Sequence, residues 1–404
     1  MKGWKPYTFN EAVECNPKAT AKKGDIIENC EMEDINPSYK FLYPREGKLY
    51  KGSNSKFQNG DTVFARITPC LENGKIAQVK GLKKNCGIGS TEFFVFRGKK
   101  NVSDNDFVYY LSKTNLVRDT AVNSMTGASG RQRADIKAVK KISIQLPPLP
   151  TQQRIASILS AYDDLIEVNN QRIKLLEQTA RELYKEWFVR LRFPGYKQAK
   201  FKKGVPEGWE INNCYSFADV KGGGTPSTHK LEYWEGNINF FTPTDHDNKF
   251  FIFETEKKIT KKGLSNSSTK LFPKYTTFIT ARGTVGNICL AGLDMAMNQS
   301  CFGIISHNVD DRFFTFLYTD EMVRYLKQVA SGATFDAITL NTFKNYKALI
   351  PSSRLRQKYS QMVSPVFYQI ENLQLQNNQL RQIRDRLLPR LISGKLQVKE
   401  SPTP

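Results

Sequence analysis

The sequence has few of the residues that metal sites and disulfide frameworks need. Its seven cysteines include no C-x-x-C pair, and its three histidines, His229, His246 and His307, stand far apart. Zinc sites use closely spaced Cys or His ligands, and disulfide frameworks use even sets of cysteines. We therefore expect no metal site and a reducing compartment.

Long apolar runs are also missing. No stretch approaches the roughly 20 apolar residues that a membrane-spanning helix needs. Residues 1–6 lead into no apolar core, so no signal peptide is expected. These absences predict a cytoplasmic chain without a membrane partner.

Motifs of catalysis are scarce as well. Gly-Lys pairs at residues 74–75 and 394–395 lack the glycine spacing and the following Ser or Thr of a phosphate-binding loop. Residues 36–39, Asn-Pro-Ser-Tyr, resemble the Asn-Pro-Pro-Tyr loop of amino-methyltransferases, but the second proline and a glycine-rich cofactor loop are missing. We interpret these residues as an ordinary turn. The sequence thus predicts neither catalysis nor a cofactor in this chain.

Two long runs with helical periodicity are present. Residues 151–191 contain neither Pro nor Gly, and their apolar residues return every three or four positions, as in a coiled-coil seam. Residues 354–393 show the same spacing. Because a helix of this length is unstable alone, we expect the two runs to pair. The side chains predicted to face the partner helix are Ile155, Leu159, Tyr162, Ile166, Asn169, Leu176, Leu183 and Trp187 in the first run, and Ile370, Leu373, Asn377, Leu380 and Leu387 in the second.

Both runs carry Asn-Asn-Gln near the middle, and Asn169 and Asn377 continue the apolar spacing. A buried Asn in a seam fixes the register of two helices at some cost in stability, whereas the alternative is that both side chains face solvent. Pro365 is expected either to kink the second helix or to mark a short first segment.

Internal matches indicate that the chain holds two copies of one larger unit. Each match is short, but their order is the same in both halves. Residues 64–66, 125–129, 145–147 and 153–154 resemble residues 280–282, 330–334, 349–351 and 357–358. The predicted organisation is a globular domain (1–150), a long helix (151–192), a second globular domain (193–350) and a second long helix (351–396).

Local patterns predict the elements of the globular segments. Residues 61–67, 92–96 and 137–146 have the composition of strands. Residues 106–116 and 311–327 are expected to form short helices at matching places in the two copies. The first long helix is expected to begin after the Pro-rich residues 147–150, with Thr151 as its N-cap.

Charge distribution points to a polyanion as partner. The net charge is +21; the first helical run is neutral and the second carries +5, so the remaining +16 lies mostly on the globular segments. Strongly basic globular domains favour nucleic acid, although a basic chain that is merely well solvated is the alternative.

Small polar and forked side chains beside glycines are candidates for DNA contacts, because they suit phosphates and base edges. For any single position, the alternative is an ordinary solvated surface residue. The candidates in the first globular segment are Arg66, Lys75, Ser90, Thr91, Arg131, Gln132 and Arg133. Those in the second are Lys221, Thr225, Ser227, Thr228, Thr242, Thr244, Asp245, Arg282 and Thr284.

Three stretches carry a resemblance to a known family. They are Gln-Gln-Arg-Ile-Ala-Ser-Ile-Leu (152–159), Arg-Leu-Leu-Pro-Arg-Leu-Ile-Ser-Gly-Lys-Leu (386–396) and Gly-Gly-Thr-Pro-Ser (223–227) followed by Tyr-Trp-Glu-Gly-Asn-Ile (233–238). With the doubled organisation, they make the whole chain resemble the specificity subunits of type I restriction–modification enzymes. The second copy departs from the pattern at Pro351-Ser352-Ser353 and at Pro365.

The resemblance implies an α+β fold in which two mixed α/β target-recognition domains are separated by a pair of long antiparallel coiled-coil helices. Each domain would read one half of a bipartite site on double-stranded DNA. The helices would set the spacer and dock two methyltransferase subunits, which would bind S-adenosylmethionine, and restriction/translocase subunits would join this core. The subunit itself would be non-catalytic.

Two other classes of function remain open from the residues alone. A single-chain methyltransferase or nuclease would bind S-adenosylmethionine or cut DNA without partners. A coiled-coil scaffold would lack DNA affinity, against which the basic globular segments argue. Within the family, an orphan recognition subunit without working partners is the third alternative.

Overall fold

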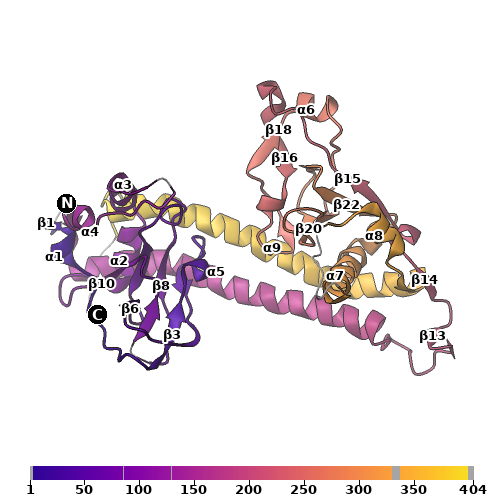
Figure 1. The fold of residues 1–404 in the computed structure, drawn as a ribbon, viewed down its shortest axis with the longest axis horizontal. Coiled ribbons are helices and arrows are strands. Elements are labelled where there is room, and N and C mark those ends of the chain that lie inside the picture. Colours follow the sequence, from indigo (N-terminus) through magenta and orange to yellow (C-terminus); the bar gives the residue numbers. More distant parts are fainter. Residues whose placement is uncertain (1–2, 85, 129, 330–336, 399–404) are drawn as a thin grey trace. The chain divides into compact units, whose positions relative to one another are not determined.

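The protein is described here by a computed structural model. It describes residues 3–84, 86–128, 130–329 and 337–398. The chain divides into two compact units: unit 1 is Met1–Asn169 with Gln376–Pro404, and unit 2 is Asn170–Leu375. Helices α5 (Leu149–Tyr184) and α9 (Ser353–Ile392) run through this division, so each unit contains one half of each helix (Figure 1).

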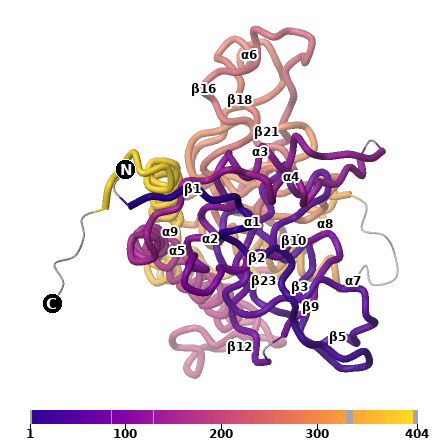
Figure 2. Tube along the Cα trace, turned by 90° about the vertical axis from the view of Figure 1, so that its left-hand side faces the viewer, coloured from indigo at the N-terminus to yellow at the C-terminus, as the bar shows by residue number. Residues whose placement is uncertain are grey.

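Unit 1 is built on a five-stranded sheet with the order β2-β10-β7-β8-β4, antiparallel except for the pair β4–β8. Its strands in that order are Val13–Cys15, Phe93–Gly98, Thr62–Ala65, Ile76–Val79 and Phe41–Leu42. A second sheet has the order β5-β3-β9-β6, in which β3 and β9 are parallel. Its strands are Arg45–Leu49, Ile26–Cys30, Gly87–Gly89 and Ser55–Phe57. Strand β1 (Lys5–Thr8) pairs with β11 (Ser143–Leu146), directly before α5. Figure 2 shows β1 near the N-terminal end of the chain.

Unit 2 is built on a five-stranded sheet with the order β15-β22-β19-β20-β17, of which only β17–β20 is parallel. Its strands are Ala218–Gly222, Cys301–Ser306, Thr277–Thr280, Ile288–Ala291 and Phe251–Ile252. A three-stranded sheet, β18-β16-β21, comprises Lys257–Ile259, Trp234–Phe241 and Ala296–Met297. Strand β14 (Glu210–Asn212) pairs with β23 (Ala348–Ile350), directly before α9, and β12 (Phe201–Lys202) pairs with β13 (Val205–Pro206).

The main sheets of the two units therefore share one topology, strand by strand, whereas the second sheets have four strands in unit 1 and three in unit 2. Each main sheet has the same order and the same single parallel pair, and each second sheet contains one parallel and one antiparallel pair about its corresponding strand, β3 or β16. In both units the strand before the long helix pairs antiparallel with a strand near the start of that unit, β1 in unit 1 and β14 in unit 2. This confirms the predicted α+β class with two similar mixed α/β domains and long helices.

Short helices connect these strands, and local capping explains where they start. In unit 1 they are α1 (Phe9–Ala12), α2 (Asn105–Ser112), α3 (Asn115–Asn123) and α4 (Ile136–Lys140). In unit 2 they are α6 (Lys261–Ser265), α7 (Arg312–Val329) and α8 (Leu340–Asn345). The side chain of Asp104 accepts a hydrogen bond from Phe107 N at 2.9 Å, and Asp135 accepts one from Lys137 N at 2.8 Å, so α2 and α4 each have an N-cap. The strand predicted over 137–146 is therefore wrong in its first half, which forms α4.

The matches at residues 145–147 and 153–154 have the same offset from the starts of α5 and α9 as their counterparts. The match of 125–129 with 330–334 lies partly outside the described residues. The sequence match of 64–66 with 280–282 differs by one residue from the correspondence that the backbone hydrogen bonds of the two sheets indicate.

In unit 1, the residue after strand β7 is held on both sides by backbone bonds. Arg66 N donates to Glu92 O at 3.0 Å, and Ala134 N donates to Arg66 O at 2.8 Å. These bonds fix the relative positions of three segments that are far apart in the sequence.

In unit 2, the same pattern occurs at Ala281. Its N donates to Ser300 O at 2.7 Å, and its O accepts from Ile338 N at 3.0 Å. Ala281 is therefore the counterpart of Arg66, and Arg282 lies one residue further along.

Unit 1 has an apolar core that includes both long helices. Phe9, Phe64 and Phe96 pack together, with ring centroids 5.2–5.4 Å apart between neighbours. Ile155 and Leu159 of α5 belong to the same cluster, as do Leu388, Leu391 and Ile392 of α9. Burying each such side chain contributes about 1.5–3 kcal/mol.

A buried polar network also lies in unit 1. Arg384 of α9 is paired with Asp163 of α5, and their side chains are 5% and 1% exposed. Tyr110 of α2 donates its hydroxyl to Asp163 at 2.6 Å. Burial raises the pKa of Tyr110, so this hydroxyl stays protonated. The network ties one globular element to both long helices.

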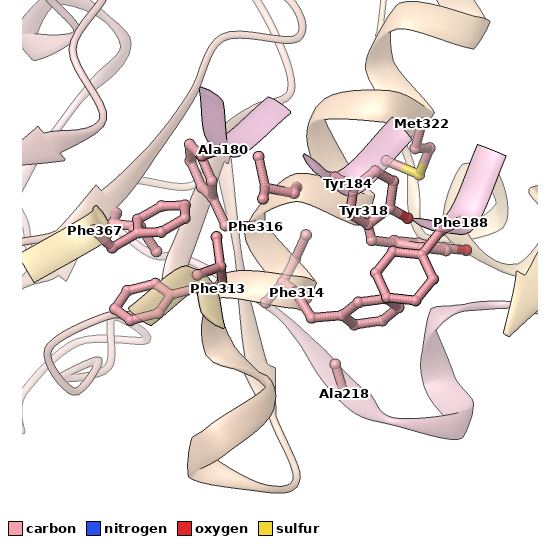
Figure 3. Packing of buried hydrophobic residues seen from close by; sticks show 14 of the residues in the cluster. Ala180, Tyr184, Phe188, Ala218, Phe313, Phe314, Phe316, Tyr318, Met322 and Phe367 are labelled. Carbon is pink, nitrogen blue, oxygen red and sulfur yellow. The ribbon is translucent and has the colours of Figure 1, made fainter. Parts of the chain in front are cut away.

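The core of unit 2 is dense in aromatic rings (Figure 3). Phe313 of α7 stacks on Phe367 of α9 with centroids 4.2 Å apart and an interplanar angle of 11°. Phe188 lies 5.1 Å from both Tyr184 and Phe314. Such pairs contribute about 0.5–1.5 kcal/mol beyond their burial, so α7 anchors the globular part of unit 2 to both long helices.

Most of the predicted helix-facing side chains are covered. Those buried are Ile155, Leu159, Ile166, Asn169, Trp187, Ile370, Leu373 and Asn377. Those half-buried are Tyr162, Leu176, Leu183, Leu380 and Leu387. Asn169 donates from Nδ2 to Asn377 Oδ1 and to Gln376 Oε1, both at 3.0 Å, so the solvent-facing alternative is wrong for this pair.

Pro365 lies inside α9, which is one continuous helix, so it does not mark a short first segment. Helix α5 begins at Leu149, two residues before the expected N-cap, because Pro150 is tolerated in a first helical turn. A π-helical turn, Lys185–Val189, follows α5.

Candidate nucleic-acid interface

Three of the first unit's candidate residues lie around one carboxylate. Glu92 lies directly before β10, and its carboxylate accepts hydrogen bonds from Arg133. Arg133 Nε lies 3.0 Å from Oε1 and 3.1 Å from Oε2, and Arg133 Nη2 lies 2.7 Å from Oε1. The Oε2 atom of Glu92, which also accepts from Arg133 Nε, lies 3.4 Å from Arg66 Nε. The hydrogen bonds that Arg133 donates to the Glu92 carboxylate raise the pKa of Arg133, which stays charged. Arg131, whose backbone O lies 3.5 Å from Arg133 Nη1, is exposed beside the pair.

A compact backbone frame holds these side chains. Thr126 and Arg133 exchange two backbone bonds of 3.0 and 2.9 Å, which close the loop carrying Arg131 and Gln132. Thr68 N donates to Gln132 O at 3.0 Å. The structure therefore brings Arg66, Arg131, Gln132 and Arg133 together.

An open pocket of about 690 Å³ lies beside Arg66. Its lining is Asn16, Pro17, Lys18, Ala19, Thr20, Ala21, Ser53, Asn54, Ser55, Lys56, Arg66, Thr91, Phe93 and Val95. Three of these residues are cationic and none is acidic, so the pocket has the charge that nucleic acid requires. Thr91 is exposed at its edge, and Ser90 stabilises the preceding turn by accepting from Glu92 N at 3.2 Å.

Lys75 lies apart from this group. Its ammonium donates to Met32 O at 2.7 Å and lines a different pocket, which also contains Glu31, Glu33 and Glu46. Arg45, Lys48 and Lys75 balance these three carboxylates, so this pocket lacks the excess positive charge of the pocket beside Arg66, and the geometry favours a phosphate contact by Lys75 less.

Arg282 in unit 2 is placed differently. It is exposed at the turn after β19 and has no ion pair with any residue that the structure describes. Gly283, which follows, has φ +79°, a conformation that favours glycine. Thr284 is exposed in the same turn, and its carbonyl accepts the hydroxyl of Thr280. Arg282 is thus available for an external ligand.

Thr242, Thr244 and Asp245 satisfy one another. They form the capping box of a 3₁₀ turn, in which Asp245 accepts from Thr242 N and from Thr242 Oγ1, both at 2.7 Å. Asp245 also accepts from Glu256 N at 2.8 Å. The side chains of Thr242 and Asp245 are therefore already hydrogen-bonded within the turn, which makes direct DNA contacts by them less favourable.

The glycine-rich loop of unit 2 approaches its own chain rather than leaving space for a partner. A Cβ on Gly224 would lie 2.3 Å from Ser268 Oγ, and one on Gly223 would lie 2.1 Å from Asn298 O. Thr225 bonds Gln299 in the same region. Lys221 lies 3.6 Å from Asp219 and is exposed.

Ser227 and Thr228 lie near the second sheet of unit 2. Ser227 O accepts from Trp234 Nε1 at 3.1 Å, and Thr228 lines a pocket of about 460 Å³. Lys257 and Lys258 line the same pocket, together with Glu235 and Glu256.

The residue patterns missed Glu92, Lys18, Lys56, Lys257 and Lys258. Lys257-Lys258 is a visible basic pair in strand β18, and two adjacent lysines are a signal that could have found it. Glu92 carries the wrong charge for a phosphate contact, and only the fold brings it to Arg66 and Arg133.

Within the described ranges, no group of three or more His, Cys, Asp or Glu side chains is arranged to hold a metal ion. No helix in that part of the chain combines the length and apolar character that crossing a bilayer requires.

Comparisons with known proteins agree with this duplicated architecture. The family model described as "Type I restriction modification DNA specificity domain" matches twice, over residues 1–178 and 206–382. The type I restriction enzyme HindI specificity subunit of Haemophilus influenzae is 24% identical over 442 residues, which cover 92% of this chain and 93% of that protein. The MjaIX specificity subunit of Methanocaldococcus jannaschii is 26% identical over 305 residues, covering 73% and 70%.

A solved structure shows the same fold. The crystal structure of the type I restriction–modification S subunit from M. genitalium aligns with a TM-score of 0.55 at 16% identity, covering 96% of both chains. The two matches of the family model, one to each copy of the repeated topology, show that the chain belongs to the family of type I restriction–modification specificity subunits, which recognise DNA and are non-catalytic.

Proposed function

We propose that each unit of this specificity subunit reads one half of a bipartite site on double-stranded DNA. One observation supports the proposal. The two units have the same main-sheet topology but different side chains at corresponding positions. Arg66, Glu92 and Arg133 correspond to Ala281, Ser300 and Ala337, as the bonds to Ala134 N and Ile338 N indicate. One scaffold with two sets of side chains suits the reading of two different sequences.

The domain division belongs to this proposal. Residues 1–150 and 193–350 are the target-recognition domains, and residues 151–192 and 351–396 are the spacer helices. The readers in the first domain are Arg66, Thr91, Arg131, Gln132 and Arg133, and those in the second include Arg282, Thr284, Ser227 and Thr228. Lys75, Ser90, Lys221, Thr225, Thr242, Thr244 and Asp245 support the reading surfaces.

The partners follow from the same role. Two methyltransferase subunits dock on the helices and carry S-adenosylmethionine, and restriction/translocase subunits complete the enzyme in the cytoplasm. Two features support a rigid spacer: continuous helices α5 and α9, and the buried Asn169–Asn377 pair that fixes their register.

The experiment is methylome sequencing of cells that carry the chain with its methyltransferase subunits. We expect adenine methylation at one bipartite site, and neither methylation nor cleavage by the purified chain alone. Tight binding of S-adenosylmethionine by the isolated chain, measured by calorimetry, would favour the single-chain enzyme instead.

A matched insertion tests the spacer role. Four residues added after Gln171 and four after Leu375 lengthen both helices by about one turn, or about 6 Å. The half-sites should stay the same, and the spacer between them should lengthen by about one to two base pairs, since DNA rises about 3.4 Å per base pair. A two-residue insertion at each place rotates the seams and should abolish assembly. An unchanged spacer with full activity would show that the helices do not set the spacing.

A further inference from the structure

In unit 1, Arg66 and Arg133 both contact the carboxylate of Glu92. Among the described residues it is the only carboxylate that either arginine pairs with. It accepts hydrogen bonds from Arg133 Nε and Nη2, and it forms an ion pair with Arg66, whose Nε lies 3.4 Å away and makes no hydrogen bond with any described residue. Its own side chain is 21% exposed, whereas those of Arg66 and Arg133 are 34% and 44% exposed. The carboxylate is thus covered more than the two guanidinium groups that it holds.

The backbone fixes where this contact forms. Arg66 N bonds Glu92 O at 3.0 Å, so the two Cα positions are set by the sheet. Arg133 is fixed by its two backbone bonds to Thr126, and the neighbouring Ala134 bonds Arg66 O. Side-chain rotation is therefore the main freedom left to the two arginines. Hydrogen bonds from Nε and Nη2 to Glu92 restrict Arg133. Arg66 is restricted by its ion pair with Glu92 and by its contact with the Phe94 ring.

Donors remain after Glu92 has been satisfied. Arg66 Nε is a buried donor without a hydrogen-bond partner among the residues that the structure describes, and Arg133 Nη1 makes one 3.5 Å contact. Arg66 also lies over the Phe94 ring, 5.4 Å from its centroid, and borders the cationic pocket that contains Lys18 and Lys56. The free end of Arg66 is therefore held against an apolar ring at the edge of a basic pocket.

Charge indicates which part of DNA this arrangement suits. A carboxylate between two arginines cancels half of their charge and repels a phosphate, so it weakens a purely electrostatic contact. It does not remove their oriented N–H donors. A fork of N–H donors matches O6 and N7 of guanine in the major groove. The same fork also fits a phosphate, but the carboxylate beside the two arginines opposes the negative charge of a phosphate.

Unit 2 lacks the arrangement. At the positions of Arg66, Glu92 and Arg133 it has Ala281, Ser300 and Ala337, none of which carries a charge. Both arginines and the carboxylate are thus absent together, as expected if the three act as a set.

We propose that Glu92 is a positioning residue, which holds Arg66 and Arg133 so that their free N–H donors read a guanine in the half-site of unit 1. This rests on the proposed function, since it assumes that unit 1 reads a half-site. A solvated surface ion pair is the ordinary alternative, and such pairs contribute little to stability.

The test is methylome sequencing of Glu92→Gln, Arg66→Lys and wild type, each with the same methyltransferase subunits. Glutamine keeps the shape of Glu92 but loses the charged acceptor. We expect about tenfold or greater loss of discrimination at one guanine of the first half-site. Arg66→Lys keeps the charge and loses the fork, so it should relax the same position.

The matched control is Glu33→Gln. Glu33 pairs with Arg45 at 2.7 Å elsewhere in unit 1 and is 71% exposed, so this variant breaks a similar ion pair outside the cluster. It should leave both half-sites unchanged. The second half-site and the spacer serve as internal controls for folding in every variant.

Three outcomes would overturn the inference. They are unchanged discrimination in Glu92→Gln, an equal loss of methylation at all sites, which indicates a phosphate contact or misfolding, and full specificity in Arg66→Lys. If wild type methylates no bipartite site, the proposed function fails as well. If wild type methylates such a site and Glu92→Gln behaves like it, only the role of Glu92 fails.

Discussion

The two recognition units have the same strand order but are tied to the long helices by different chemistry. In unit 1, α2 reaches the helices through the buried network of Tyr110, Asp163 and Arg384. In unit 2, α7 reaches them through stacked rings, among them Phe313 and Phe367. The repeat is therefore defined by the backbone pairing of its strands. The side chains that connect each globular part to the long helices differ between the units.

The same separation holds at the candidate reading surfaces. The backbone bonds around Arg66 and Ala281 are alike, but the side chains at these positions are not. A repeat of this kind lets the reading residues change without a change in the sheet.

Arg384→Met should destabilise unit 1 by about 3–5 kcal/mol, because it leaves Asp163 buried without its cation. Hydrogen exchange followed by peptide mass spectrometry should show faster exchange in α2 and β10 than in α7 and β22. The double variant Asp163→Asn/Arg384→Met should recover part of the loss, because no unpaired charge remains. Equal losses in both units would contradict the assignment of this network to unit 1.

Glu177→Gln should stabilise unit 2 at high pH. Burial raises the pKa of Glu177 to about 7, against the opposing charge of Arg181, 3.8 Å away. Ionised Glu177 therefore lowers the stability of the folded state. This destabilisation is complete above about pH 7, the folded pKa, and absent below about pH 4.5, the unfolded pKa. The variant should gain about 2–3 kcal/mol at pH 8 and almost nothing at pH 4. A gain that does not depend on pH would reject this cause.

Thr242→Ala should cost unit 2 about 1 kcal/mol, because it removes one side of the capping box with Asp245. The melting temperature should fall by about 2–4 °C, while the methylated sequence stays the same. A changed half-site would instead place Thr242 among the reading residues. This variant therefore separates structural from reading positions on one surface.

Much of the architecture was predictable because it depends on periodicity and order. The spacing of apolar residues predicted both long helices, and the ordered matches predicted two copies. Individual seam positions were less predictable. Leu165 and Ile383 continue the spacing but are 39% and 45% exposed, whereas Phe367 is fully buried. The globular elements cover part of each helix, so the partner helix alone does not decide which face is buried.

The candidate site was predicted in part, for a related reason. Residue types indicated Arg66 and Arg133. The sequence match between the two copies aligned Arg66 with Arg282, whereas the backbone hydrogen bonds show that Arg66 corresponds to Ala281. Glu92 carried no signal, because its role depends on contacts across strands. Thr242 and Asp245 looked like binding residues, since capping uses the same side chains as DNA contacts.

The central claim is that each unit reads its own half-site. Methylome sequencing of two variants tests it most directly: Arg66→Ala/Glu92→Ser/Arg133→Ala, which gives unit 1 the residues of unit 2, and Arg282→Ala. The first should relax one position of one half-site only, and the second should relax the other half-site only, each by about tenfold or more. The spacer should be the same in both. Changes that fall in the same half-site, or in both half-sites at once, would contradict the account.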